Sequence, residues 1–320
     1  MSRNALVTGG TGFVGQWLSR ALLQDGWNVV ALGLHAAGTG VLTPAERSGI
    51  EWLHGDIRNS DSVFHALDKS APDAVFHLAG VSFIPEARGM PAATYDVNVL
   101  GAVRLVSEVS RRRAAGDLDP VVLVVGSATQ YGKHAHEEMP LDESAEQRPV
   151  DVYAASKAAQ EVAALQVHRA EGVRVICTRS FNHSGAGHPE HFLLPALVRR
   201  ALALRGSGEH ELRLGNQDSI RDYLHVADVV RAYLLLLGHG QPGEVYNVCS
   251  GTGISVRQLA EEVLLQVGLP VEITTDPSLV RRVDIPELVG SPAKLEAATG
   301  WRPAHARAEI IHDLINAASH

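Results

Sequence analysis

Lysine and cysteine are both scarce in this chain of 320 residues. Only four of its 28 basic residues are lysine, no basic run exceeds three residues, and 36 acidic residues bring the formal net charge to −8. Nucleic acids bind positively charged surfaces, so this balance argues against a nucleic acid as the main partner. Cys177 and Cys249 have no metal-binding or redox spacing, which predicts buried thiols in a reducing compartment. We therefore expect a cytoplasmic protein.

The chain also lacks long apolar runs and metal-binding patterns. No apolar stretch near a terminus is long enough to span a membrane, and residues 1–8 are strand-like, without the basic segment and cleavage site of a signal peptide. We expect no membrane partner. The 16 histidines do not form a helical H-E-x-x-H pattern or lie beside a cysteine pair, so we interpret them as loop residues and predict no metal.

Short apolar runs alternate with helical patterns in the first half of the chain. The pattern predicts strands at residues 4–8, 28–32, 50–54, 74–77, 120–125 and 173–177. It predicts helices at residues 13–25, 61–67, 91–113 and 153–170. Strands and helices that alternate in this order predict an α/β fold with a doubly wound parallel sheet of the Rossmann type.

The pattern changes after Arg179, where a loop rich in glycine and histidine begins. Further helices are predicted at residues 192–204, 226–237, 256–267, 293–298 and 309–318, with a strand at 245–248 and a polar, hairpin-like stretch after residue 204. We expect two domains that share segments. One is a dinucleotide-binding domain of residues 1–179 and about 222–250, and the other is a smaller, discontinuous α/β substrate domain of residues 180–221 and 251–320.

The strongest local signal is the turn that joins the first strand to the first helix, Thr8-Gly9-Gly10-Thr11-Gly12-Phe13-Val14-Gly15. Gly9 permits a tight turn, Gly12 lets the backbone approach a pyrophosphate, and Gly15 allows close packing of the helix. The N–H groups of the helix N-terminus would then face phosphate. A glycine-rich turn without a ligand is the alternative, but the strand–turn–helix context favours a dinucleotide site.

A second signal is the spacing of Tyr153 and Lys157. Residues four apart share a helical face, so the Lys157 ammonium could lie near the Tyr153 phenol and lower its pKa. The strand before this helix ends at Ser127, which places a hydroxyl at the carboxyl edge of the sheet, where ligands bind in this architecture. A tyrosine–lysine spacing alone is common by chance, and its place after a dinucleotide motif gives it weight.

These motifs resemble those of the extended short-chain dehydrogenases/reductases, the NAD(P)-dependent epimerases, dehydratases and reductases of nucleotide sugars. The resemblance covers essentially the whole chain. It implies that Ser127, Tyr153 and Lys157 are catalytic. Tyr153 would exchange a proton with a sugar oxygen, Ser127 would hydrogen-bond that oxygen, and Lys157 would hold the nicotinamide ribose.

The same resemblance implies NADP(H) or NAD(H) as the cofactor. Its binding residues would be Gly9, Thr11, Gly12, Phe13, Val14, Gly15, Asp56, Ile57, Leu78, Ala79, Gly80, Asn98, Tyr153 and Lys157. For Asn98 we favour helix packing over a proton relay. NAD-retaining members usually carry an acid at the end of the second strand, where this chain has Gly33, and this difference permits NADP(H).

The second half of the chain is similar to the GDP-sugar enzymes of this family, in the loop at 179–188 and the segment at 214–222. A nucleoside-diphosphate sugar, with a GDP-linked one favoured, would be bound by Ser82, Phe83, Ser127, Thr129, Asn182, Arg221, Arg281 and Asp284. An arginine fork suits phosphate better than lysine does. A surface ion pair with Asp222 is the alternative for Arg221.

The resemblance favours reduction of the C4 keto group of a GDP-4-keto-6-deoxyhexose. Dehydratases of the family need an additional acid at the position of Thr129, whose hydroxyl is too weakly acidic to act as a base. A nucleotide-sugar 4-epimerase with tightly bound NAD is the alternative. A non-catalytic NAD(P)-sensing protein is less favoured because Tyr153 and Lys157 are both present. A homodimer that pairs the helices at 91–113 and 153–170 is also expected from the family.

Overall fold

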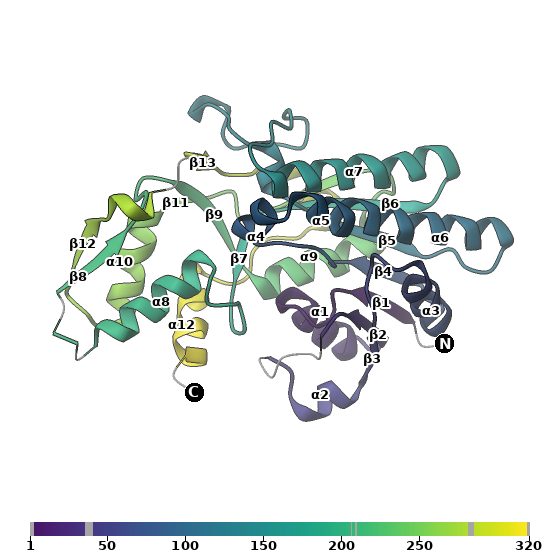
Figure 1. The fold of residues 1–320 in the computed structure, drawn as a ribbon, viewed down its shortest axis with the longest axis horizontal. Coiled ribbons are helices and arrows are strands. Elements are labelled where there is room, and N and C mark those ends of the chain that lie inside the picture. Colours follow the sequence, from purple (N-terminus) through teal and green to yellow (C-terminus); the bar gives the residue numbers. More distant parts are fainter. Residues whose placement is uncertain (1–2, 36–40, 206, 209, 281–284, 319–320) are drawn as a thin grey trace.

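The computed structural model describes residues 3–35, 41–205, 207–208, 210–280 and 285–318. Its main element is a seven-stranded parallel sheet in the order β10-β6-β5-β4-β1-β2-β3 (Figure 1). The strands are β1 (Asn4–Thr8), β2 (Asn28–Gly33), β3 (Ile50–His54), β4 (Ala74–His77), β5 (Val121–Ser127), β6 (Arg174–Ser180) and β10 (Val245–Val248). The chain order reverses between β1 and β4, the place where ligands bind in such sheets. The predicted Rossmann-type fold is confirmed.

Helices cover both faces of this sheet (Figure 1). One face carries α1 (Phe13–Gln24), α9 (Val226–His239) and α11 (Ala293–Thr299), and the other carries α3 (Ser60–Ser70), α6 (Gly101–Ala115) and α7 (Val152–Glu171). Ala5 and Val7 belong to the first core and Leu6 to the second, because successive strand residues point to opposite faces. A strand buried on both faces is therefore a continuous apolar run. The short helix α2 (Pro44–Ser48) precedes β3.

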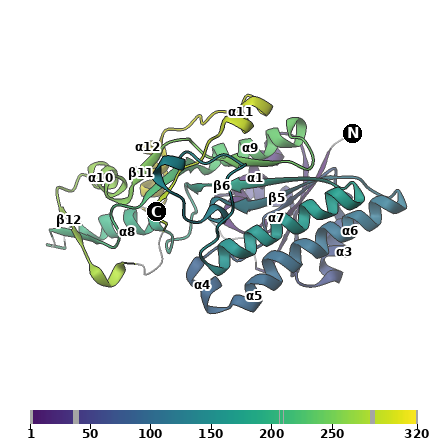
Figure 2. The ribbon, with the colours of Figure 1, turned by 90° about the horizontal axis from the view of Figure 1, so that it is seen from above.

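The helix predicted at 91–113 is interrupted. The chain forms α4 (Ile84–Gly89), α5 (Pro91–Tyr95), a π-helical segment η1 (Asp96–Leu100) and then α6. Apolar periodicity did not reveal the interruption, because a π segment changes the helical register by only one residue. Asn98 lies in this segment and is wholly buried. Figure 2 shows α6 and α7 side by side along the outer face of the sheet.

The other elements form two small sheets. One contains β7 (Asn182–Ser184), β9 (Ile220–His225), β11 (Gly253–Ser255) and β13 (Glu287–Leu288), and the other pairs β8 (Glu211–Leu214) with β12 (Glu272–Thr275). They share a hydrophobic core with α8 (Leu193–Leu204), α10 (Val256–Val267) and α12 (Arg307–Ala318). The predicted hairpin-like stretch is wrong, because β8 and β9 pair with strands from distant segments rather than with each other.

Some segments cross the expected domain boundaries. From the second half of the chain, α9 and β10 pack with the large sheet, as does α11, although it follows residue 251. Among the described strands, β9 pairs only with strands of the small sheet. The predicted boundary near residue 222 instead assigns residues 222–225 to the domain of the large sheet. The division into two domains stays a prediction.

Candidate active site

The glycine turn after β1 has no room for additional side chains. Gly9 has φ +72°, a conformation that favours glycine, and a Cβ atom there would lie 2.7 Å from the Ala79 nitrogen. A Cβ atom on Gly15 would lie 2.4 Å from the Gly9 oxygen. Gly12 precedes α1 without a side-chain cap, and the first turn of α1 has no acidic residue. These residues therefore fit a dinucleotide, whose phosphates would meet the helix N-terminus.

The segment after β4 runs beside this turn. The Leu78 N–H donates to the Thr8 carbonyl at 3.1 Å. A Cβ atom on Gly80 would lie 2.9 Å from Asn98 Oδ1 and 3.5 Å from Lys157 Nζ. Asn98 accepts from the Val81 N–H at 2.8 Å, donates to the Val81 carbonyl at 3.1 Å and donates to the Ser156 hydroxyl at 2.8 Å. Asn98 thus joins this loop to α7.

The other expected cofactor residues lie around the carboxyl edge of the sheet. Asp56 accepts from the Arg58 guanidinium at 2.6 Å, and this hydrogen bond lowers the pKa of Asp56. Ile57 is buried against Gly101. Val14 is half-buried against the core on the α1 face, and Phe13 stacks on His188 at 4.6 Å between ring centroids. No contact among described residues tests their roles toward a cofactor.

The end of β5 and the start of α7 bring the expected proton-transfer residues together. Asp151 accepts from the Ala154 N–H at 2.8 Å and so begins α7 just before Tyr153. The Ser127 hydroxyl lies 2.9 Å from the Thr129 hydroxyl, and its interaction with the Tyr153 phenol acts to lower the pKa of that phenol. A sugar oxygen placed at this point could receive hydrogen bonds from both Ser127 and Tyr153.

Lys157 lies one turn along α7 and is only 5% exposed. Its ammonium donates to the Val125 carbonyl and to Gln160 Oε1, each at 2.9 Å. Both acceptors are neutral, and burial lowers the pKa of Lys157 to about 8. His77, at the end of β4, has a pKa of about 3, first because of burial and second because of the Lys157 charge. His77 is therefore a neutral imidazole, whose Nδ1 lies 2.8 Å from the Thr8 hydroxyl.

The expected lowering of the Tyr153 pKa is not found. Burial raises the pKa of Tyr153 above 10, the hydrogen bond with Ser127 opposes this rise, and the Asp151 charge adds to it. The prediction relied on the four-residue spacing, whereas the Lys157 ammonium is bound by Val125 and Gln160. Tyr153 is thus a protonated phenol at neutral pH.

The expected substrate residues are more dispersed. Phe83 packs on His191 and Phe192, with ring centroids 4.4 and 5.7 Å apart, and Ser82 beside it is exposed. Asn182 is in β7, opposite Tyr223 of β9.

The arginine expected at the diphosphate lies in β9 as well. Arg221 donates to the carbonyl of Ile220 at 2.8 Å, and its strand neighbours are β11 and β13. Arg281 and Asp284 lie outside the described residues. No contact joins Asn182 or Arg221 to the Ser127–Tyr153 pair within the described ranges, so their roles stay predictions.

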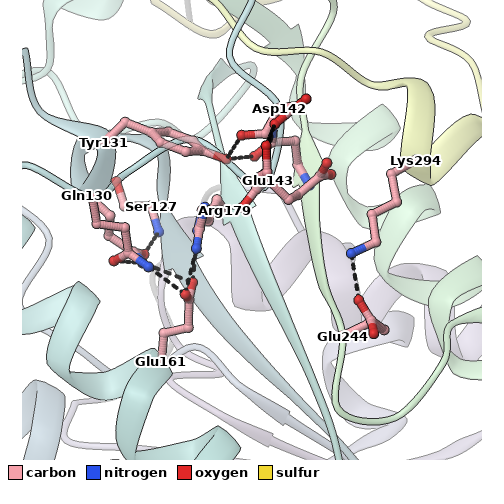
Figure 3. A network of polar contacts seen from close by, with 12 residues as sticks. Ser127, Gln130, Tyr131, Asp142, Glu143, Glu161, Arg179, Glu244 and Lys294 are labelled. Carbon is pink, nitrogen blue, oxygen red and sulfur yellow. Dashed lines mark hydrogen bonds and ion pairs between the residues drawn. The ribbon is translucent and has the colours of Figure 1, made fainter. Parts of the chain in front are cut away.

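A buried polar network beside Ser127 was missed by sequence reasoning (Figure 3). Arg179 donates to both oxygens of Glu161, at 2.7 and 2.9 Å, and Gln130 donates to Glu161 at 3.0 Å. The Arg179 guanidinium also lies over the Tyr131 ring, 4.8 Å from its centroid. One signal was available for Glu161, because it follows Lys157 by the same four residues that separate Lys157 from Tyr153.

In the described part of the chain, no three histidine, cysteine or acidic residues are grouped so that they could hold a metal ion. No helix in that part is long and apolar enough to cross a membrane.

A Rossmann-type sheet with a glycine turn after its first strand, and with serine, tyrosine and lysine at its carboxyl edge, defines an extended short-chain dehydrogenase/reductase. The family model described as GDP-mannose 4,6 dehydratase matches residues 6–314. The chain belongs to this family, and the resemblance seen in its motifs is confirmed.

Two relatives and one solved structure illustrate the similarity. The GDP-6-deoxy-D-mannose reductase of Pseudomonas aeruginosa is 36% identical over 304 residues, which cover 95% of this chain and 93% of that protein. The UDP-glucose 4-epimerase of Streptomyces lividans is 32% identical over 331 residues, which cover 98% of this chain and 95% of that protein. The structure of RMD from Pseudomonas aeruginosa complexed with NADPH has a TM-score of 0.82 and 32% identity, and covers 99% of this chain and 100% of that one.

Proposed function

We propose that the protein reduces the C4 keto group of a GDP-4-keto-6-deoxyhexose, with NADP(H) or NAD(H) as cofactor. The observation that carries this proposal is the arrangement around Ser127, whose hydroxyl lies 2.9 Å from the Thr129 hydroxyl and interacts with the Tyr153 phenol. This arrangement suits proton donation to a carbonyl oxygen. It provides no carboxylate at position 129 for a dehydration. The similarity to a GDP-6-deoxy-D-mannose reductase and to a structure with NADPH supports the same conclusion.

Each side chain then has a distinct task. The nicotinamide cofactor supplies a hydride when bound. The Tyr153 phenol donates its proton to the C4 oxygen, and its raised pKa keeps it in the protonated form that this step needs. The Ser127 hydroxyl donates a hydrogen bond to the same oxygen. Lys157 has three N–H donors and meets two acceptors among the described residues, so its third donor could bind the ribose.

The end of β2 favours NADP(H) as the cofactor. A Cβ atom on Gly33 would lie 2.4 Å from the Thr11 hydroxyl oxygen, so an acid that binds a ribose 2′-hydroxyl cannot be placed there without moving Thr11. The next residues, Leu34 and His35, are exposed, and neither has an acidic side chain. A 2′-phosphate would therefore meet no carboxylate at this position.

A nucleotide-sugar 4-epimerase is the second candidate, favoured by the similarity to the Streptomyces lividans enzyme. The two functions differ in what the purified protein contains and needs. An epimerase would retain NAD and convert its substrate without added cofactor, whereas a reductase would consume NADPH or NADH in proportion to product.

The test is to add GDP-4-keto-6-deoxy-D-mannose and NADPH, and to follow the loss of NADPH absorbance and the sugar product. The Tyr153→Phe variant should bind cofactor normally and lose about 100-fold or more in kcat, because the proton donor is gone. Absence of NADPH consumption, or near-normal turnover in this variant, would contradict the proposal. UDP-glucose in the same assay tests the epimerase.

We also propose a cytoplasmic homodimer that binds its substrate between two domains divided near residues 179, 222 and 251. Leu100 at the end of η1 and Val162 on α7 are 47% and 62% exposed, which suits a face covered by a second copy. Asn182 and Arg221, with Arg281 and Asp284, would hold the nucleoside diphosphate. Both cysteines are free and buried, as suits a reducing compartment.

A further inference from the structure

A side chain outside the mechanism holds the backbone of Ser127. Gln130 is wholly buried, and its Oε1 accepts from the Ser127 N–H at 2.7 Å. Its Nε2 donates to Glu161 at 3.0 Å, and Glu161 is bound at both oxygens by Arg179 (Figure 3). A continuous line of hydrogen bonds therefore joins a buried ion pair to the backbone of the serine that contacts Tyr153.

The orientation of the Gln130 amide is determined by its partners. An ionised carboxylate only accepts hydrogen bonds, so the Nε2 group must face Glu161. The Oε1 atom must then face the Ser127 N–H, and the opposite orientation would place an acceptor against a carboxylate and a donor against a donor. A Cβ atom on Gly126 would lie 2.4 Å from Gln130 Oε1, so the amide packs directly on the backbone of β5.

This link connects the two elements that carry the catalytic residues. Ser127 ends β5, whereas Tyr153, Lys157 and Glu161 follow one another at four-residue intervals along α7. Gln130 bonds to the first element and, through Glu161, to the second. Gln130 therefore joins the backbone of Ser127 to the helix that carries the Tyr153 phenol. A displacement of about 1 Å at such a site can reduce turnover about 100-fold.

We propose that Gln130 is a positioning residue, which sets the place of Ser127 relative to Tyr153 by linking the Ser127 N–H to the Glu161–Arg179 ion pair. The inference rests on the proposed reductase function for its kinetic test. It adds to that function a residue that does not touch substrate or cofactor.

The first test compares Gln130→Met with a matched control, Gln147→Met. Gln147 donates to the same Glu161 carboxylate at 2.6 Å and accepts from Gln130 Nε2 at 3.2 Å, but it makes no hydrogen bond to Ser127 among the described residues. Gln130→Met should lower kcat about 10- to 100-fold, with KM values for cofactor and sugar nucleotide within about twofold of the parent. Gln147→Met should keep its kcat, although both variants lose stability.

A second variant, Gln130→Glu, gives a signature in the pH profile. The charged groups that face this position are Glu161 on α7 and Arg179 on β6. When protonated, the introduced acid offers a carbonyl oxygen to the Ser127 N–H and an O–H donor to Glu161. When ionised, it repels Glu161 and has no donor. Its kcat relative to the parent should therefore rise as the pH falls, whereas the ratio for Gln130→Met should not change.

A third measurement is independent of turnover. Hydrogen exchange of the Ser127 amide should become faster in Gln130→Met and stay unchanged in Gln147→Met, because only the first removes its acceptor. If the parent reduces no keto sugar, the proposed function fails and the exchange experiment still tests the link. The inference is overturned if Gln130→Met keeps kcat within about twofold of the parent, or if the Met variants at 130 and 147 exchange alike.

Discussion

Replacing Lys157 by methionine should change stability in a way that depends on pH. Burial lowers the pKa of this ammonium from 10.5 to about 8, and both of its acceptors are neutral. At about 1.4 kcal/mol per pH unit, the charged form costs the fold about 3 kcal/mol at neutral pH. Methionine keeps the apolar stem and removes the charge. It also leaves the Val125 carbonyl and Gln160 without a donor, which offsets part of the gain by about 1 kcal/mol each.

The sign of the pH dependence follows from where the proton is lost. Below the folded pKa of about 8, both folded and unfolded states carry the charge, so the full cost of burial is present. As the pH rises from about 8 to 10.5, the folded state releases its proton while the unfolded state keeps it, and the parent becomes more stable. The advantage of Lys157→Met should therefore shrink by about 2 to 3 kcal/mol between about pH 7 and about pH 10.

The assay is urea unfolding at each pH, followed by the fluorescence of the four tryptophans. Lys69→Met is the control, because Lys69 is half exposed in a surface pair with Glu51 and its removal should give no such trend. The Lys157 variant should also lose turnover. A difference in unfolding free energy that stays constant over this pH range would refute the reasoning.

Three further predictions concern other parts of the molecule. Arg179→Met would leave the Glu161 carboxylate buried without its guanidinium, and urea unfolding should show a loss of about 3 to 5 kcal/mol; a loss below about 1 kcal/mol would contradict this. Gly9→Ala should weaken NADPH binding about tenfold or more in a fluorescence titration. The reason is that the added Cβ atom would be strained at a φ of +72° and would lie 2.7 Å from the Ala79 nitrogen. Unchanged affinity would show that the turn does not contact the cofactor. Val162→Glu should give a monomer by light scattering, while a dimer would place the interface elsewhere.

Several features of the fold could be predicted from the sequence. The strands at 4–8, 50–54, 74–77 and 245–248 have the bounds that the apolar runs indicated. The strands at 4–8 and 74–77 lie inside a sheet covered on both faces, so nearly every residue must be apolar and the run ends where the strand ends. The glycine turn was equally recognisable, because close approach of the backbone allows no Cβ atom at several positions in sequence.

Tertiary contacts decided other features. The partners of β8 and β9 come from segments that are distant in sequence, and the π segment at 96–100 changes a helix without changing its composition. Local periodicity does not encode which distant segment supplies a partner strand.

The features of the active site were likewise determined partly by the sequence and partly by the tertiary structure. The sequence alone determined that Tyr153 and Lys157 share one face of a helix and that Ser127 ends a strand, because these relations are local. Only the tertiary structure decided that burial raises the Tyr153 pKa and that Gln130 connects Ser127 to a buried ion pair. Desolvation and side-chain hydrogen bonds depend on groups brought together from distant parts of the chain, and spacing along the sequence carries no measure of either.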